Sequence, residues 1–191
     1  MPTLLLPVTK WLIIFNASVH LVNASLFLPS LAASLSPPDK RLLLRGFFAT
    51  VLTYYVGHGR PSLHVSDFFE STNPIPVPPH AIAPNLHPSE GTLDPRNLNQ
   101  NPWMPIITSA LNHPDEHLIK CQRALVHYAS MYGARPSFGQ NRIKDLEGGE
   151  KIDGSLFIRV AGLVGSARAW MREGQEKVPD WNRDYFEESR M

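Results

Sequence analysis

The segment Leu111–Gly133, LNHPDEHLIKCQRALVHYASMYG, has the pattern of an α-helix. Its apolar side chains recur at intervals of three and four residues, which places them on one helical face: Leu118, Cys121, Leu125 and Tyr128. Proline is favoured at the first position of a helix, and glycine is common just beyond the last. The segment therefore predicts a helix that begins at Pro114 and ends near Gly133, with His113 capping its start.

The first residues of this segment, His113 to His117, also fit the pattern H-x-x-E-H of a class of zinc peptidases. Two histidines share a metal in that pattern only if both are helical, and Pro114 places His113 outside the helix. We therefore expect no metal site. Asp115 and Glu116 form an acidic first turn, which the helix dipole favours. Capping alone and a functional role both remain open for these two residues.

The rest of the chain predicts further helices and no strand. Nine of the 18 prolines lie between Pro74 and Pro105, and proline disfavours both helix and central strand. The other predicted helices are Trp11–Leu35 with a break near Pro29, Lys40–Tyr55, Trp103–Leu111, and one from Asp153 with the buried stripe Leu156, Phe157, Val160, Ala161 and Val164. We expect one all-α domain over residues 1–191, a bundle of about five or six helices with a proline-rich irregular loop at 61–102.

Composition narrows the classes of function. Of the 191 residues, 43% are hydrophobic and 18% are charged, as in an ordinary globular domain. The net charge of +1 gives no reason to expect a nucleic-acid partner. The one cysteine, Cys121, cannot form an internal disulfide, which fits a reducing compartment. We expect a cytoplasmic protein.

The apolar run at 11–35 raises the alternative of a membrane or targeting segment. Asn16, His20 and Asn23 fall on one face of that helix, and a lipid-exposed helix would pay for such a polar stripe. We expect the run to pack inside the protein, and a membrane-anchored helical protein remains an alternative.

Polar side chains on two of the predicted helices are the candidate site. On the segment that opens this section, His113, His117 and Lys120 recur on one helical face. Burying such groups without partners is costly, so we predict that the turn with Asp115, His117 and Lys120 faces His20 across a cavity that also receives Arg60. The candidate catalytic residues, which would polarise a carbonyl or transfer protons, are His20, Asp115, His117 and Lys120. Asn23, Arg60 and Arg123 are the candidate substrate-binding residues. The motif Gly57-His58-Gly59 lacks the third glycine of a dinucleotide fingerprint and follows a helix, not a strand.

Several segments, in the same order along the chain, resemble the fungal questin oxidase-like family. These segments are FNASVHLVNASLFLPSL, RLLLRGFFATVLTYYVGHGRPSL, PWMPIITSALNHPDEHLIKCQRALVHYASMYG and IDGSLFIRVAGLV, followed by a tryptophan-bearing tail. The family's His-rich N-terminal helix has no match here. The chain thus resembles the C-terminal part of such a protein, or a shortened paralogue. If the missing part supplies catalytic groups, we expect the chain to be inactive by itself.

The resemblance implies a flavin-free oxidoreductase that carries out Baeyer–Villiger-type oxygenation of an aromatic polyketide ketone, such as an anthraquinone. It also implies NADPH as the cofactor. The alternative is a non-catalytic helical remnant that binds a hydrophobic ligand or a partner.

Overall fold

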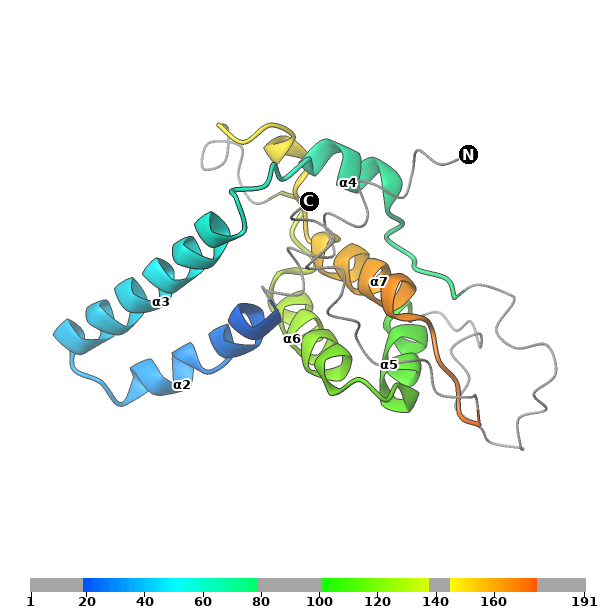
Figure 1. The fold of residues 1–191 in the computed structure, drawn as a ribbon, viewed down its shortest axis with the longest axis horizontal. Coiled ribbons are helices and arrows are strands. Elements are labelled where there is room, and N and C mark those ends of the chain that lie inside the picture. The colour runs from blue at the N-terminus through cyan, green and yellow to red at the C-terminus, as the bar shows by residue number, and fades with distance from the viewer. Residues whose placement is uncertain (1–18, 79–100, 138–144, 175–191) are drawn as a thin grey trace. The chain divides into compact units, whose positions relative to one another are not determined.

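The computed structural model describes residues 19–78, 101–137 and 145–174, and every regular element in these ranges is helical (Figure 1). The elements are α2 (Leu28–Ala33), α3 (Pro37–Gly57), α4 (Val65–Ser71), α5 (Trp103–Asn112), α6 (Glu116–Tyr132), the 3₁₀ turn η1 (Gly149–Lys151) and α7 (Leu156–Arg168). The predicted all-α fold is confirmed. The chain divides into two compact units, which we call unit 1 (residues up to Leu63) and unit 2 (from His64 on). Whether they act as the single predicted domain stays a prediction.

Unit 1 consists of a helical stretch at residues 19–25, then α2, then the long helix α3. Ser36 caps α3: its Oγ accepts a hydrogen bond from the Asp39 backbone amide at 3.4 Å and donates to Asp39 Oδ2 at 2.5 Å. The first bond satisfies a backbone donor that the first helical turn leaves unpaired, and the second orients the Ser36 hydroxyl. The helix contains the whole predicted range 40–55. Pro29 is the second residue of α2, which agrees with the predicted break near that residue.

Unit 1 buries very little of its apolar surface. Within residues 19–63, Val19 is the only buried residue. The prediction that residues 11–35 pack in the interior is therefore wrong for 20–35, while 11–18 lie outside the described residues. The turn at Leu26–Phe27 breaks the predicted helix in two, and the His20 imidazole is exposed, which spares the cost of burying it. Among the described helices, none combines the length and apolarity needed to cross a bilayer.

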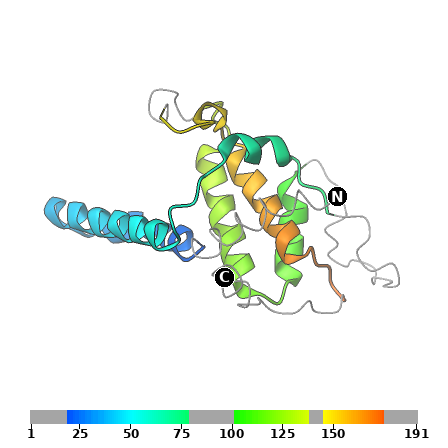
Figure 2. The ribbon, with the colours of Figure 1, turned by 45° about the horizontal axis from the view of Figure 1, so that its top comes forward.

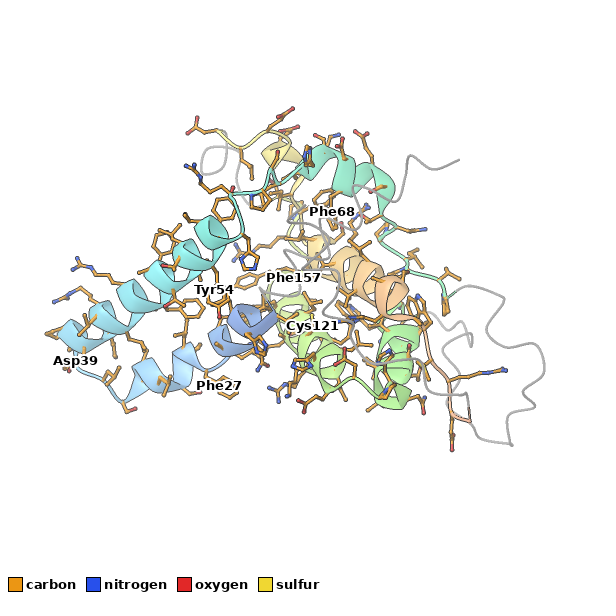
Figure 3. The ribbon with its side chains drawn as sticks, viewed as in Figure 1. Phe27, Asp39, Tyr54, Phe68, Cys121 and Phe157 are labelled. Atoms are coloured by element: carbon orange, nitrogen blue, oxygen red, sulfur yellow. The ribbon has the colours of Figure 1, made fainter. Side chains whose placement is uncertain are left out.

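Unit 2 has its core where α5, α6 and α7 lie side by side, as both ribbon views show (Figures 1 and 2). The small side chains of Ala124 on α6 and Ala161 on α7 allow close approach, and neither has any exposed surface. Gln122 Nε2 donates to the Ala161 carbonyl at 2.9 Å. The other buried apolar side chains are Val65, Phe68, Ile106, Ala110, Leu118, Cys121, Leu125, Ile158, Val164, Trp170 and Met171. Figure 3 labels Cys121 and Phe68 among them. Burial raises the pKa of the Cys121 thiol to about 12.

One segment predicted to be irregular contains a helix. The predicted loop at 61–102 includes α4, which is only seven residues long and owes its stability to contacts with the rest of unit 2. Phe68 is buried, and Arg159 of α7 donates to the carbonyls of Phe69 (3.0 Å) and Thr72 at the end of α4. These partners lie nearly ninety residues apart, so no local pattern indicates their contact. The sequence therefore predicted a loop from its proline content. Residues 79–100 lie outside the described residues.

The starts of α6 and α7 differ from the predicted positions. The cap of α6 is Asp115, not His113, and Pro114 precedes the helix. Ser155 takes the place of Asp153 as the cap of α7, and the Asp153 carboxylate accepts from the Ser155 amide at 2.8 Å. In both places an aspartate carboxylate accepts a hydrogen bond from a backbone amide at the start of the helix. Of the predicted α7 stripe, Ala161 and Val164 are buried, whereas Leu156, Phe157 and Val160 are half-buried.

The packing of α7 against the segment after α4 gives the first testable prediction. A Cβ on Gly162 would lie 2.5 Å from the Pro76 ring, whereas a Cβ on Gly46 of α3 would meet nothing within 4 Å. Both glycines are inside helices, where alanine is favoured by about 0.5 to 1 kcal/mol. Gly46→Ala should therefore raise the urea midpoint measured by far-UV circular dichroism, and Gly162→Ala should lower it. Equal midpoints for the two variants would contradict the packing described here.

Candidate functional site

The candidate site is the turn between α5 and α6, where a carboxylate is buried at the start of a helix. The side chain of Asp115 is 2% exposed. Its Oδ1 accepts two hydrogen bonds from His117, one from the backbone amide at 2.9 Å and one from ring Nδ1 at 3.0 Å. The first is the capping bond of α6, and the second fixes the orientation of the imidazole.

Because the carboxylate only accepts hydrogen bonds, its contact assigns the proton of the neutral His117 ring to Nδ1. The second ring nitrogen, Nε2, is then a hydrogen-bond acceptor and a base. About a third (34%) of the His117 side chain is exposed, so the ring is accessible from outside the core. A buried carboxylate that holds a histidine in one tautomer is the arrangement by which a general base is oriented.

His113 connects this turn to the end of α7. Its Nδ1 accepts from the Asp115 backbone amide at 3.0 Å, so its Nε2 donates to the Arg168 carbonyl at 2.8 Å. With His113 as the C-cap of α5, the pair His113 and His117 lacks the one-turn helical spacing of a zinc pair. The two histidines thus have different tautomers and different partners.

Arg168 supplies the positive charge nearest to the buried carboxylate. Its NH2 lies 3.6 Å from Asp115 Oδ2, and its side chain is 16% exposed. Two N–H donors on Oδ1, the guanidinium and the positive end of the α6 dipole lower the cost of burying this charge. Within the described residues, Oδ2 itself accepts no hydrogen bond. The next residue, Ala169, has φ 69°, a strained value for a residue with a Cβ. Beyond it, the Met171 amide donates to Ser109 Oγ at 2.8 Å, which fastens the end of α7 to α5.

Two predicted site residues on α6 lie apart from the carboxylate. Lys120 Nζ pairs with Glu116 Oε2 at 3.0 Å, and both side chains are largely exposed. A surface pair at this helical spacing needs no functional explanation. Arg123 is exposed on α6. The structure thus brings together Asp115 and His117 but pairs Lys120 with a different carboxylate.

The remaining predicted site residues belong to unit 1. His20 and Arg60 are exposed, and Asn23 is half-buried. Arg60 has φ 51° and lies in the turn after α3. The predicted cavity shared by His20, Arg60 and the start of α6 stays a prediction, because it would join two units that are each described by themselves.

Sequence reasoning missed Arg168 entirely. A basic residue in the last turn of a helix is common, because it offsets the negative end of the helix dipole. Arg168 lies more than fifty residues beyond its partner, so no local spacing relates it to Asp115. His113 was singled out, but as a cap and not as the connection to α7.

The glycine pair before Arg60 does not fit the phosphates of NADPH. Phosphate-binding loops offer free backbone amides at the start of a helix, and Gly57-His58-Gly59 stands at the end of one. The amides of His58, Gly59 and Arg60 instead donate to carbonyls of α3 at 2.9 to 3.1 Å. This turn is therefore not a site for the phosphates of that cofactor.

The buried cap gives a second prediction. Asp115→Ala removes the acceptor for the His117 amide and leaves Arg168 without its carboxylate. It should lower the free energy of unfolding by about 1 kcal/mol or more, the usual cost of losing a cap. Asp115→Asn keeps a capping oxygen and should lose less. Urea unfolding of both variants measures the difference, and equal stability of Asp115→Ala and the unaltered chain would contradict the role of the cap.

Comparison with known proteins matched one family model, and the matched range includes this turn. The model of the questin oxidase-like family matches residues 17–125, more than half of the chain. The matched range includes all seven predicted site residues and stops before Arg168, so the resemblance of residues 152–164 stays a prediction. Neither the curated proteins nor the solved structures gave a match. The chain belongs to the questin oxidase-like family.

Proposed function

We propose that this chain is an oxidoreductase that inserts an oxygen atom next to a ketone of an aromatic polyketide such as an anthraquinone. The observation that carries the proposal is the position of the Asp115–His117 pair. In this pair the carboxylate orients the histidine as a base, and both residues lie within the range that matches the questin oxidase-like family. A cytoplasmic location and NADPH as reductant are part of the proposal and rest on composition and on the family.

The overall reaction takes up one molecule of O₂. One oxygen atom enters the bond between the carbonyl carbon and its neighbour and forms an ester. The other leaves as water, with two electrons and a proton from NADPH and one further proton from solvent. Such a reaction needs a group that removes and returns protons near the reacting carbonyl.

His117 is suited to that role by its contacts. With the proton of the neutral ring on Nδ1, Nε2 accepts a proton from a substrate hydroxyl or from a hydroperoxide. The positive charge that forms on the ring lies beside Asp115, at 3.0 Å from Oδ1. A base of this kind contributes about 10²- to 10⁴-fold in rate. Asp115 is a positioning residue in this account, since it acts through the histidine.

Two other groups on α6 are less suited to the chemistry. Cys121 is 1% exposed, and a thiol whose pKa is about 12 is not a thiolate nucleophile at neutral pH. Lys120 already pairs with Glu116 on the surface. Its proposed catalytic role is therefore weaker than that of His117.

The test uses the full chain with a hydroxylated anthraquinone, NADPH and ¹⁸O₂, and mass spectrometry of the product. We expect a product heavier by one labelled oxygen atom. His117→Ala should lower kcat about 100-fold or more. Asp115→Asn should lower kcat with little change in KM, because it removes the charge that orients and stabilises the base and not a contact with the substrate.

His127→Ala is the matched control, since His127 is an exposed histidine on the same helix and should leave turnover unchanged. Absence of any oxygenated product from the folded chain would contradict the proposal and favour a non-catalytic family member. Full activity of His117→Ala would remove His117 from the mechanism.

A further inference from the structure

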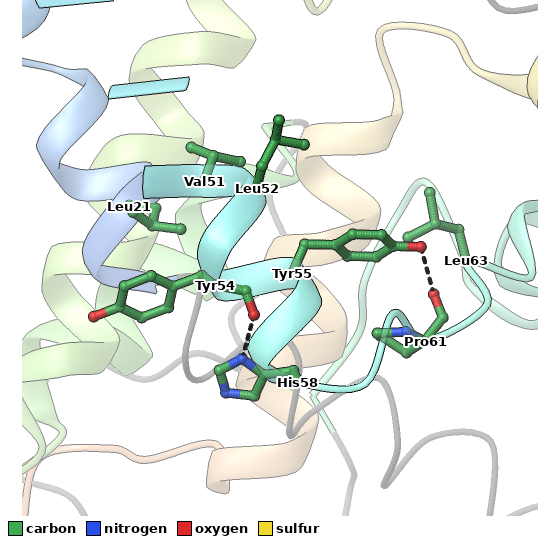
Figure 4. Close-up of a pocket in the computed structure, with 8 residues that line it drawn as sticks. All are labelled: Leu21, Val51, Leu52, Tyr54, Tyr55, His58, Pro61 and Leu63. Atoms are coloured by element: carbon green, nitrogen blue, oxygen red, sulfur yellow. Dashed lines mark hydrogen bonds between the residues drawn. The ribbon is translucent and has the colours of Figure 1, made fainter. Parts of the chain in front are cut away.

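Unit 1 contains a pocket that the proposed chemistry does not use. It has a volume of about 350 Å³ and is formed by the second half of α3, the turn after it and Leu21 (Figure 4). Ligand sites span about 300 to 1,000 Å³, so this pocket holds a compact small molecule and not a peptide.

The turn after α3 builds one wall of the pocket. Gly59 and Arg60 both have positive φ, 78° and 51°, and together they reverse the chain at the end of the helix. The Tyr55 hydroxyl then donates to the Pro61 carbonyl at 3.1 Å, which holds the reversed segment along α3. The turn at Gly57-His58-Gly59, which does not fit a phosphate, instead brings Pro61 and Leu63 back toward Tyr55.

The lining of the pocket is apolar and aromatic. None of the described residues that line it is Asp, Glu, Lys or Arg, so a charged ligand would lose its hydration without finding an opposite charge. Tyr54 and Tyr55 are 41% and 37% exposed, which leaves apolar surface for a ligand to cover.

The rings in the pocket favour a flat ligand. The Tyr54 and His58 rings are nearly parallel, with an interplanar angle of 19° and centroids 6.1 Å apart. The His58 ring is held in place because its Nδ1 donates to the Tyr54 carbonyl at 2.7 Å. Aromatic side chains stack in offset or edge-to-face arrangements, and a flat aromatic ligand can extend such an arrangement where a saturated one cannot.

We infer that this pocket binds a neutral, flat aromatic molecule of about two or three fused rings, a size set by its volume. The inference goes beyond the proposed function, because the pocket lies within unit 1 and binding there requires no turnover. A chain that binds such a molecule without oxygenating anything would keep this inference and reject the proposed function.

The test is calorimetric titration of the full chain with 2-naphthol. We expect saturable binding of one molecule per chain. Two further probes should each bind at least about tenfold more weakly. Naphthalene-2-sulfonate adds a negative charge that the lining does not pair, and decahydro-2-naphthol is saturated and cannot stack on the aromatic rings. Absence of saturable binding, or equal affinity for all three probes, would overturn the inference.

Variants locate the binding. Val51→Trp fills the pocket and should abolish binding of 2-naphthol, whereas Leu42→Trp, on the same helix at a side chain that is 70% exposed and outside the lining, should not. Tyr54→Leu removes one ring and should weaken binding about three- to tenfold, the effect of an aromatic pair.

Far-UV circular dichroism shows whether each variant keeps its helices. If Val51→Trp loses them, Tyr54→Leu and the probe comparison decide the question. Unchanged affinity in a folded Val51→Trp or in Tyr54→Leu would place the ligand elsewhere and overturn the inference.

Discussion

A buried carboxylate at the start of one helix determines how unit 2 is arranged. Asp115 has to find partners for its charge inside the protein, and these are the His117 backbone amide, the His117 ring and the Arg168 guanidinium. Those partners fix the first turn of α6 and place the last turn of α7 beside it. His113 adds a second connection between the same two places. The apolar contacts of α5, α6 and α7 supply most of the burial, but they are less directional than these hydrogen bonds.

The same contacts that stabilise the turn prepare it for chemistry. A capping carboxylate needs only a backbone amide, yet Asp115 also takes the ring N–H of His117, which leaves a basic nitrogen on a partly exposed imidazole. Strain at Ala169 is consistent with this interpretation, because the chain accepts an unfavourable φ directly after the carbonyl that His113 holds. Stability and orientation of the base therefore depend on one group. Substitution of that group by asparagine separates the two effects, since the cap survives and the charge does not.

The sequence predicted the helices well because their patterns are local. The apolar spacing from Leu118 to Leu125 and the prolines before α3 act within a few residues, so α3, α5 and α6 were found within two or three positions of their observed ends. What the sequence could not reveal depends on distant partners. Arg159 of α7 stabilises the short helix α4, and Arg168 contacts the site from the end of α7. The cap of α6 is Asp115, where the sequence predicted His113. Asp115 and His117 were both predicted as site residues, whereas the pairing of Lys120 with Glu116 was not.

The tautomers of the two histidines test this account most directly. Nitrogen NMR of the full chain with ¹⁵N-labelled histidine distinguishes the protonated from the unprotonated ring nitrogen. We expect neutral His117 to carry its proton on Nδ1 and neutral His113 on Nε2, and we expect Asp115→Asn to disturb the signals of both rings. A neutral His117 protonated on Nε2, with signals unchanged by Asp115→Asn, would show that the carboxylate does not orient the ring and would contradict the central claim.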